Sequence, residues 1–193
     1  MGASGAQGCG RDHNRGGGRP ASPRSHQGAL LRGDDLSLVD DVGELLRSRG
    51  KTLALAESCT GGLLGAMLTS VPGSSDHFLA SFVTYSDRAK VDTLGVHDRV
   101  LFDHGAVSAE CAAEMASGAR RAGRADIGLS ITGIAGPGGG SATKPVGLTY
   151  IAVDDGMVSR VERHVFPGDR ESVRKAAAER ALEILLELMR PTS

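Results

Sequence analysis

The sequence predicts an α/β protein of one domain, in which a mixed sheet lies between two layers of helices. Apolar strand-like segments alternate with helix-like segments over the first part of the chain, and the last two strand-like segments follow each other as a hairpin. Only 3% of the 193 residues are aromatic and none is Trp, whereas 40% are hydrophobic. The core must therefore be aliphatic and rich in small residues, which favours close packing of helices on a sheet.

The first half of the chain shows clear helix and strand signals. Leu36, Val39, Val42 and Leu46 recur at helical spacing before Gly50. The predicted elements of this half are a helix at 35–49, a buried strand at 53–56, a helix at 63–70 that Val71-Pro72-Gly73 ends, a strand at 78–85, a helix at 87–94 closed by Gly95, and a short helical turn at 100–103.

The second half begins with Ser108, a typical N-cap residue, and this predicts a helix from 108 to 121. A strand is expected at 127–131, followed by a Gly/Pro loop. Strands at 146–153 and 157–166 flank Asp154-Asp155-Gly156, which is a hairpin signal. Asp169 is expected to cap a last helix through Met189. Because early strands alternate with helices and late ones form a hairpin, the sheet should be mixed.

Charge and composition divide the chain at residue 33. Residues 1–33 hold five Arg and one Asp in a Gly/Ser/Pro-rich segment and are expected to be a disordered tail, while residues 34–193 carry a net charge of −5 and form the predicted domain. This acidic balance argues against a nucleic-acid-binding groove in the folded part. No segment is apolar enough for a membrane span or for the core of a signal peptide. The three Cys are scattered and do not form a disulfide framework. A cytoplasmic protein is therefore expected.

Three hydroxyl side chains follow predicted strands: Ser58, Tyr85 and Thr132. Ligands of such sheets bind at the carboxyl ends of strands, so these side chains should meet at one edge. Ser58 is the candidate nucleophile, with N–H groups near Thr60, Gly61 and Gly62 as candidate oxyanion donors. The alternative is that Ser58 only caps the next helix, although Thr60 offers a second cap. Cys59 is a less favoured nucleophile, because no His is obviously near it.

Lys90 is the candidate general base. The chain has 18 Arg and only 4 Lys, and a Lys can lose its proton when it is desolvated whereas an Arg cannot. Tyr85 precedes it by five residues and is a candidate proton relay. The alternative for Lys90 is an ordinary surface lysine. The six His form no triad with Ser58 and have no metal-ligand spacing, so no metal site is predicted.

Two further segments are candidates for substrate binding. The glycine-rich stretch 133–140, which includes Gly136 and Gly138, lacks the Lys-Ser/Thr of a phosphate-binding P-loop but suits a substrate wall or lid. Arg170 lies in the first turn of the last helix, where a cation opposes the helix dipole, which suggests an anionic partner such as a phosphate. Each segment has an alternative interpretation. The loop could be only a flexible connection, and Arg170 could form a salt bridge with Glu171 or another nearby acid.

The motifs together resemble one known family, the CinA C-terminal domain family, which includes the nicotinamide-nucleotide amidohydrolases of the PncC type. The resemblance covers roughly residues 36–190. The segments that carry it are Leu-Ala-Glu-Ser-Cys-Thr-Gly-Gly at 55–62, Val-Pro-Gly-Ser-Ser at 71–75, Tyr-Ser-Asp-Arg-Ala-Lys at 85–90, His-Gly-Ala-Val-Ser at 104–108, Ile-Thr-Gly-Ile-Ala-Gly-Pro-Gly-Gly-Gly at 131–140, Lys-Pro-Val-Gly at 144–147 and Phe-Pro-Gly-Asp-Arg at 166–170.

This resemblance implies a three-layer α/β/α fold and the deamidation of nicotinamide mononucleotide to nicotinate mononucleotide and ammonia. It implies functional roles for Ser58, Tyr85, Lys90 and Thr132, a homodimer, and no metal or other cofactor. Two rival functions remain: a non-catalytic nucleotide-sensing or competence-related interaction module, and a different amidase or esterase that uses the same site.

Overall fold

A computed structural model describes residues 33–189 of the chain. The predicted tail at 1–33 lies, apart from Gly33, outside the described residues. Five strands form one sheet in the order β2-β1-β3-β4-β5. The strands are β1 (Leu53–Glu57), β2 (Phe78–Val83), β3 (Ile127–Gly133), β4 (Leu148–Asp154) and β5 (Ser159–Val165). Strand β1 is parallel to β2 and to β3, whereas β4 is antiparallel to both of its neighbours, so the predicted mixed sheet is confirmed.

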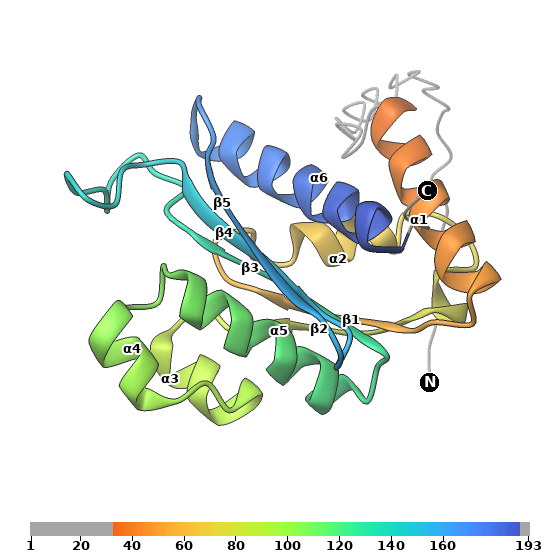
Figure 1. The fold of residues 1–193 in the computed structure, drawn as a ribbon. Coiled ribbons are helices and arrows are strands. Elements are labelled where there is room, and N and C mark those ends of the chain that lie inside the picture. The colour runs from red at the N-terminus through yellow and green to blue at the C-terminus, as the bar shows by residue number, and fades with distance from the viewer. Residues whose placement is uncertain (1–32, 190–193) are drawn as a thin grey trace, which may run out of the picture.

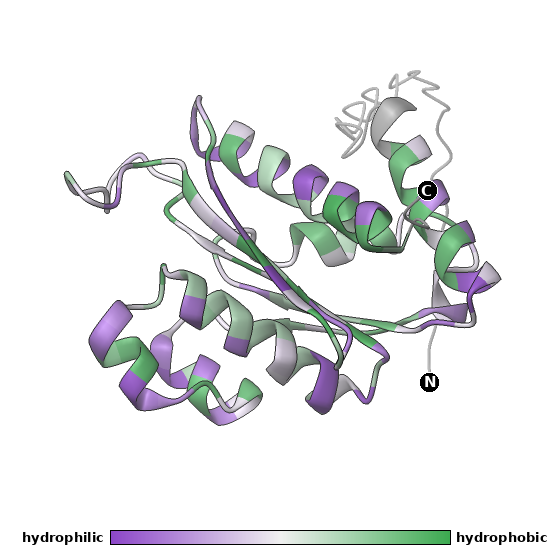
Figure 2. Cartoon of the chain, in the orientation of Figure 1, coloured by the Kyte–Doolittle hydropathy of each residue, from purple (hydrophilic) through white to green (hydrophobic). Residues whose placement is uncertain are grey.

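Helices cover both faces of this sheet, which confirms the α/β class and the two helical layers (Figure 1). On one face lie α1 (Gly33–Ser48), α2 (Leu63–Leu68) and α6 (Arg170–Met189), and on the other α3 (Asp87–Ala89), α4 (Asp98–His104) and α5 (Ala109–Gly123). Short helical turns η1 (Ser74–Asp76) and η2 (Lys90–Leu94) complete the fold. Figure 2 shows that the helix surfaces facing the sheet are the hydrophobic ones.

The core is aliphatic and rich in Ala, as the low aromatic content predicted. Its larger part joins α1, α2 and α6 to the sheet through buried Leu, Ile, Val and Met side chains. The part on the other face is built from smaller side chains, among them Ala54, Ala56 and Ala119. Small side chains allow α5 to approach the sheet closely, and α5 contacts all five strands.

The structure departs from the predicted elements mainly between residues 84 and 104. Strand β2 ends at Val83, so Thr84 and Tyr85 lie beyond it. The helix expected at 87–94 is a single turn, α3, with Ser86 as its N-cap, followed directly by the π-helical turn η2. The short turn expected at 100–103 is the longer helix α4. A π-helical turn contains one residue more than an α-helical turn, and apolar periodicity does not reveal it.

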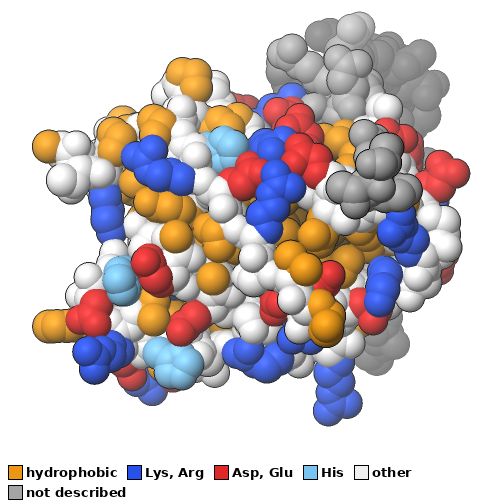
Figure 3. Space-filling model, viewed as in Figure 1, with side chains coloured by type: hydrophobic (Ala, Val, Ile, Leu, Met, Phe, Trp, Pro, Cys, Tyr) orange, Lys and Arg blue, Asp and Glu red, His pale blue; other side chains and the backbone are white. Residues whose placement is uncertain are grey.

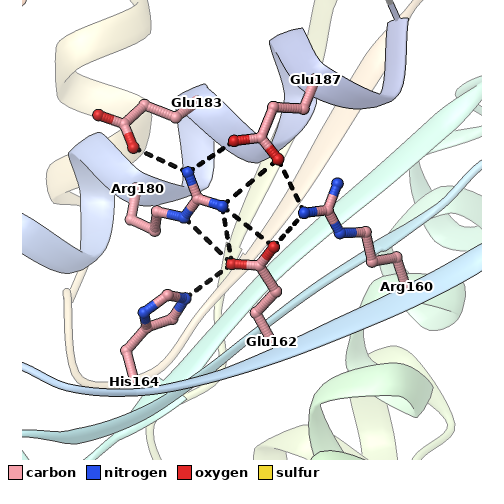
Figure 4. A network of polar contacts seen from close by, with 6 residues as sticks. All are labelled: Arg160, Glu162, His164, Arg180, Glu183 and Glu187. Atoms are coloured by element: carbon pink, nitrogen blue, oxygen red, sulfur yellow. Dashed lines mark hydrogen bonds and ion pairs between the residues drawn. The ribbon is translucent and has the colours of Figure 1, made fainter. Parts of the chain in front are cut away.

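Strand β5 is an edge of the sheet, and its polar side chains tie it to α6. Acidic and basic groups gather where α6 crosses β5 (Figure 3), and Figure 4 shows their network at close range. Glu162 accepts hydrogen bonds from Arg180 at 3.0 and 3.1 Å and is paired with Arg160, while Arg180 also binds Glu183 and Glu187. Charged groups on an edge strand oppose pairing with another chain. In the described part of the chain, no helix has the length and apolarity needed to cross a membrane.

Candidate active site

A cavity of about 280 Å³ opens where the parallel strands β1, β2 and β3 end. Seven of the residues predicted from the sequence line it: Ser58, Tyr85, Lys90, Thr132, Gly136, Gly138 and Arg170. Three do not line it: Thr60, Gly61 and Gly62. The structure therefore brings together the three strand-end hydroxyls, the lysine, the glycine-rich loop and the first residue of α6.

Ser58 and Lys90 form a hydrogen bond inside this cavity. Ser58 follows β1, and its backbone N–H donates to the Ile131 carbonyl of β3, which fixes it at the strand end. The Lys90 Nζ lies 3.3 Å from the Ser58 Oγ. Both side chains are buried, with 8% of Ser58 and only 1% of Lys90 exposed. The alternative of a surface lysine is thus excluded, and a proton can pass directly between the two groups.

The surroundings of Lys90 favour its neutral form. Its Nζ also donates to the Thr84 carbonyl at 3.0 Å and to the Tyr85 carbonyl at 3.4 Å, so its partners are uncharged oxygens. Burial lowers the pKa of Lys90 below its ordinary value of 10.5, against smaller opposing effects, the first of them from Cys111. A desolvated amine with a lowered pKa is suited to act as a base toward a hydroxyl.

The Tyr85 phenol is hydrogen-bonded to Arg170, and no hydrogen bond joins it to Lys90 or Ser58. Its phenol oxygen accepts a hydrogen bond from the Arg170 Nη2 at 3.2 Å, and 61% of the residue is exposed. The Tyr85 group that orients the Lys90 amine is its backbone carbonyl. Ser58 and Lys90 touch directly, and Tyr85 lines the cavity, so a relay through its phenol stays a prediction.

Arg170 projects from the start of α6 toward the same rim. Its Nη1 donates to the Gly136 carbonyl at 2.9 Å, which joins α6 to the glycine-rich loop. No described acidic side chain forms an ion pair with Arg170, so the alternative of a salt bridge with Glu171 is not what the structure shows. A cation without an acidic partner beside a cavity is available to an anionic ligand.

The N-terminus of α2 is already occupied by a carboxylate of the chain itself. Glu57 is fully buried, and its side chain accepts hydrogen bonds from the N–H groups of Gly62, Leu64 and Gly65 at 2.9–3.1 Å. The Gly61 N–H donates to the Ser58 carbonyl. The expectation that N–H groups at Gly61 and Gly62 hold an oxyanion is therefore wrong, because those donors have internal acceptors.

These two glycines serve the backbone instead. Gly61 and Gly62 have φ values of +60° and +94°, in the left-handed region that other residues rarely adopt. They turn the chain sharply between β1 and α2. Thr60 is not the helix cap, since the N-cap of α2 is Gly62, and the Thr60 hydroxyl has no partner among the described residues. Its carbonyl accepts two hydrogen bonds from Arg174 of α6.

Replacing Glu57 by Gln should destabilise the fold. Gln has a similar shape, but it can accept on one side-chain oxygen only, and its amide N–H₂ would face the backbone donors of α2. We expect the free energy of unfolding to fall by about 2–3 kcal/mol, because buried donors lose a charged acceptor. Urea denaturation measures this loss, with Glu44→Gln, on the exposed side of α1, as the matched control. Equal stabilities of the two variants would contradict the role assigned to Glu57.

A wall of the cavity comes from the segment between α4 and α5, which the sequence analysis did not assign to the site. Ala106 and Val107 line the cavity. The Thr132 hydroxyl donates to the Ala106 carbonyl at 2.7 Å, and Lys144 donates to the His104 carbonyl at 2.7 Å. Thr132 is thus bound to this wall, and Lys144 anchors the glycine-rich loop to it. Apolar Ala and Val in a loop carry no chemical signal, so only the resemblance at 104–108 marked this segment.

Cys59 lines the cavity next to Ser58, but its thiol is a poor nucleophile. Burial raises the pKa of Cys59 to about 11, in spite of an opposing effect of its own backbone N–H and of Arg170. The thiol therefore keeps its proton at neutral pH. Its backbone N–H acts on its own thiol and donates to no other described residue. Within residues 33–189, no cluster of three or more His, Cys, Asp or Glu side chains could hold a metal ion.

The family model of the CinA C-terminal domain matches residues 35–189 of the chain. Among curated proteins, a CinA-like protein of Syntrophobacter fumaroxidans is 53% identical over 156 residues, which cover 81% of this chain and 37% of that protein. A putative competence-damage inducible protein of Moorella thermoacetica is 52% identical over 157 residues, covering 81% of this chain and 38% of that protein. The chain thus matches less than two-fifths of the length of these relatives.

Solved structures match over nearly their whole length. The crystal structure of the competence/damage inducible protein CihA from Agrobacterium tumefaciens superimposes with a TM-score of 0.82 at 40% identity, and the match covers 84% of this chain and 99% of that one. The CinA superfamily protein KP700603 from Klebsiella pneumoniae 700603 matches with a TM-score of 0.78 at 36% identity, over 80% of this chain and 97% of that one.

Proposed function

We propose that this chain, which belongs to the CinA C-terminal domain family, is an amidohydrolase that converts nicotinamide mononucleotide to nicotinate mononucleotide and ammonia. The observation that carries the proposal is the buried Lys90 amine at 3.3 Å from the Ser58 hydroxyl, at the floor of a cavity. Serine with lysine as its base is an established alternative to the Ser-His-Asp triad. The printed names of the relatives mention competence and damage and specify no reaction.

The first chemical step is acyl transfer to Ser58. Neutral Lys90 takes the Ser58 proton, and the Ser58 Oγ attacks the carboxamide carbon. The carbonyl oxygen becomes an oxyanion, for which the backbone N–H of Cys59, a residue that lines the cavity, is the candidate donor. The protonated Lys90 then gives its proton to the leaving nitrogen, the C–N bond breaks, and ammonia departs from the acyl-enzyme.

The second step returns the enzyme to its starting state. Lys90, neutral again, takes a proton from a water molecule that attacks the ester carbon. The ester bond to the Ser58 Oγ breaks, Lys90 returns the proton to that oxygen, and the nicotinate carboxylate leaves. The Lys90 amine thus serves twice as base and twice as acid. This requires a pKa below that of an ordinary lysine, and burial lowers the pKa of Lys90.

A phosphorylated substrate fits the charges and the size of the cavity. Arg170 lies at the rim without an acidic partner among the described residues. Beside it, the glycine-rich loop contributes backbone with no side chains at Gly136, Gly138 and Gly139, so a phosphate can come close. A volume of about 280 Å³ is at the lower end of small-molecule sites, which favours a mononucleotide over a dinucleotide.

Replacing Arg170 by Met should weaken the binding of the phosphorylated substrate selectively. A charged hydrogen bond is worth about 1.5–3 kcal/mol, so we expect the KM for nicotinamide mononucleotide to rise by about 10- to 100-fold. The KM for nicotinamide riboside, which has no phosphate, should change little. Steady-state ammonia release with both substrates measures this, and Arg163→Met on the exposed side of β5 is the matched control. Equal losses with both substrates would contradict phosphate recognition by Arg170.

The proposed reaction is separated from its rivals by two measurements. Ammonia release from nicotinamide mononucleotide tests the enzyme, and calorimetry with the same compound tests binding. Binding without turnover would indicate a nucleotide-sensing module instead. A panel of carboxamides and esters with and without ribose phosphate tests for another amidase or esterase. A homodimer and a cytoplasmic location remain predictions, and light scattering of the purified chain tests the first.

A further inference from the structure

We propose that Gly118 of α5 is a positioning residue for Lys90: its missing side chain lets η2 lie against α5 and hold the Lys90 amine beside Ser58, away from water. The role of that amine as a base rests on the proposed function. The placement of the amine rests on packing alone, and it is tested separately below.

The contact between Gly118 and η2 is unusually close. A Cβ atom built on Gly118 would lie 2.3 Å from the Leu94 carbonyl oxygen and 2.8 Å from the Leu94 Cβ. The first of these is a backbone atom, so no rotation of a side chain can relieve the overlap. Ala is a better helix former than Gly, and a Gly within α5 therefore indicates a need for close approach. Any larger residue must displace η2.

Lys90 and Leu94 are the two ends of η2, so a displacement at one end reaches the other. The turn is closed by hydrogen bonds from the Gly95 and Val96 N–H groups to the Lys90 carbonyl. Cys111 lies seven residues before Gly118 on α5, which is two turns along the same face, and Leu94 and Cys111 belong to one buried cluster. This face of α5 thus supports η2.

The pKa of a lysine that is shielded in this way responds to small displacements of the backbone around it. The ionisable groups that act on Lys90 are Cys111 from α5, Asp87 from α3, Cys59 after β1 and Tyr85 after β2, and burial outweighs all of them. The hydrogen-bond acceptors of the amine are the oxygens already named at Ser58, Thr84 and Tyr85. If η2 moves off α5, water reaches the amine and its charged form becomes more favourable.

The test is the titration of Lys90 in Gly118→Ala, followed by NMR of labelled lysine side chains. The chain has only four Lys, so the Lys90 signal is assigned by its absence in Lys90→Met. We expect its pKa in Gly118→Ala to rise by about one unit toward the ordinary value. The acid limb of the kcat/KM profile for nicotinamide mononucleotide should move to higher pH by the same amount, which simple destabilisation would not produce.

Gly123→Ala is the matched control. It lies on the same helix, and its added Cβ would overlap the Ala54 Cβ at 2.6 Å, but it would meet no atom of η2. The inference is overturned if Gly118→Ala leaves the Lys90 pKa unchanged, or if Gly123→Ala raises it equally. If Gly118→Ala does not fold, Leu94→Ala is the second variant: it keeps the atoms that touch Gly118 but removes the buried side chain that packs η2 against Met115 and Ala119 of α5, and the same rise is expected. Because the NMR titration needs no turnover, it decides the inference even if nicotinamide mononucleotide is not a substrate.

Discussion

Replacing Ser58 by Ala should lower kcat for ammonia release from nicotinamide mononucleotide by about 10⁴-fold or more. In the proposed mechanism the hydroxyl oxygen forms the acyl-enzyme, and no other described hydroxyl lies as close to the Lys90 amine. The loss corresponds to about 5.5 kcal/mol of transition-state stabilisation, and a small residual rate should remain from substrate binding. Steady-state and single-turnover ammonia assays measure it.

Two further measurements make this result specific to the hydroxyl. Calorimetry should show that Ser58→Ala still binds the substrate within a few-fold, because Arg170 and the loop are unchanged. Cys59→Ala removes the neighbouring thiol, whose raised pKa keeps it protonated, and activity should stay within about ten-fold of the original. Near-normal turnover by Ser58→Ala, or loss of turnover only in Cys59→Ala, would remove Ser58 from the role of nucleophile.

Replacing Lys90 by Arg or by Met should have an effect on kcat of similar size. Arg keeps a positive charge but cannot give up its proton, and Met fills similar space without a base. We expect kcat to fall by about 10³- to 10⁴-fold in both variants, since Ser58 loses its proton acceptor. Lys51→Met makes the same chemical change at an exposed lysine and should retain activity. Substantial activity in Lys90→Arg would rule out proton abstraction by Lys90.

Lys90→Met also changes how stability depends on pH. Burial lowers the pKa of Lys90 in the native state, so between that value and 10.5 the unfolded chain holds a proton that the native protein has lost. The free energy of unfolding of the unchanged protein should therefore gain up to about 1.4 kcal/mol per pH unit in this window, and this gain is absent in Lys90→Met. Urea denaturation at several pH values measures the difference, and parallel curves would contradict a desolvated lysine.

The sequence predicted the parts of this site that depend on strand ends. Parallel neighbouring strands bring their carboxyl ends to one edge, so the positions of Ser58 and Thr132 followed from local patterns. The proximity of Lys90 to Ser58 did not follow from local patterns, because it depends on a π-helical turn that no periodicity reveals. Its choice as base came from the scarcity of Lys and from the resemblance.

The hydrogen bonds of Glu57 and Tyr85 could not be predicted from the sequence, for a different reason. Glu57 lies next to Ser58 in the sequence, but whether its carboxylate turns to solvent or back toward α2 depends on the packing of α2 against β2, where Ser81 also donates to it. Tyr85 lines the cavity, where its place after a predicted strand put it, whereas its phenol is bonded to Arg170, which is 85 residues away. Contacts of that separation are set by tertiary structure.

The reactive pair and the walls of the cavity belong to different parts of the chain. Ser58 and Lys90 are held by β1, by the Glu57 carboxylate and by the seating of η2 on α5, whose N-cap is Ser108, and none of these supports comes from the cavity-lining segments 106–107 or 134–140. Natural drift or laboratory evolution can therefore alter those two segments without disturbing the nucleophile. Under the proposed function, new carboxamide specificities should arise there by changes in loop sequence, while the Ser58–Lys90 pair is inherited intact.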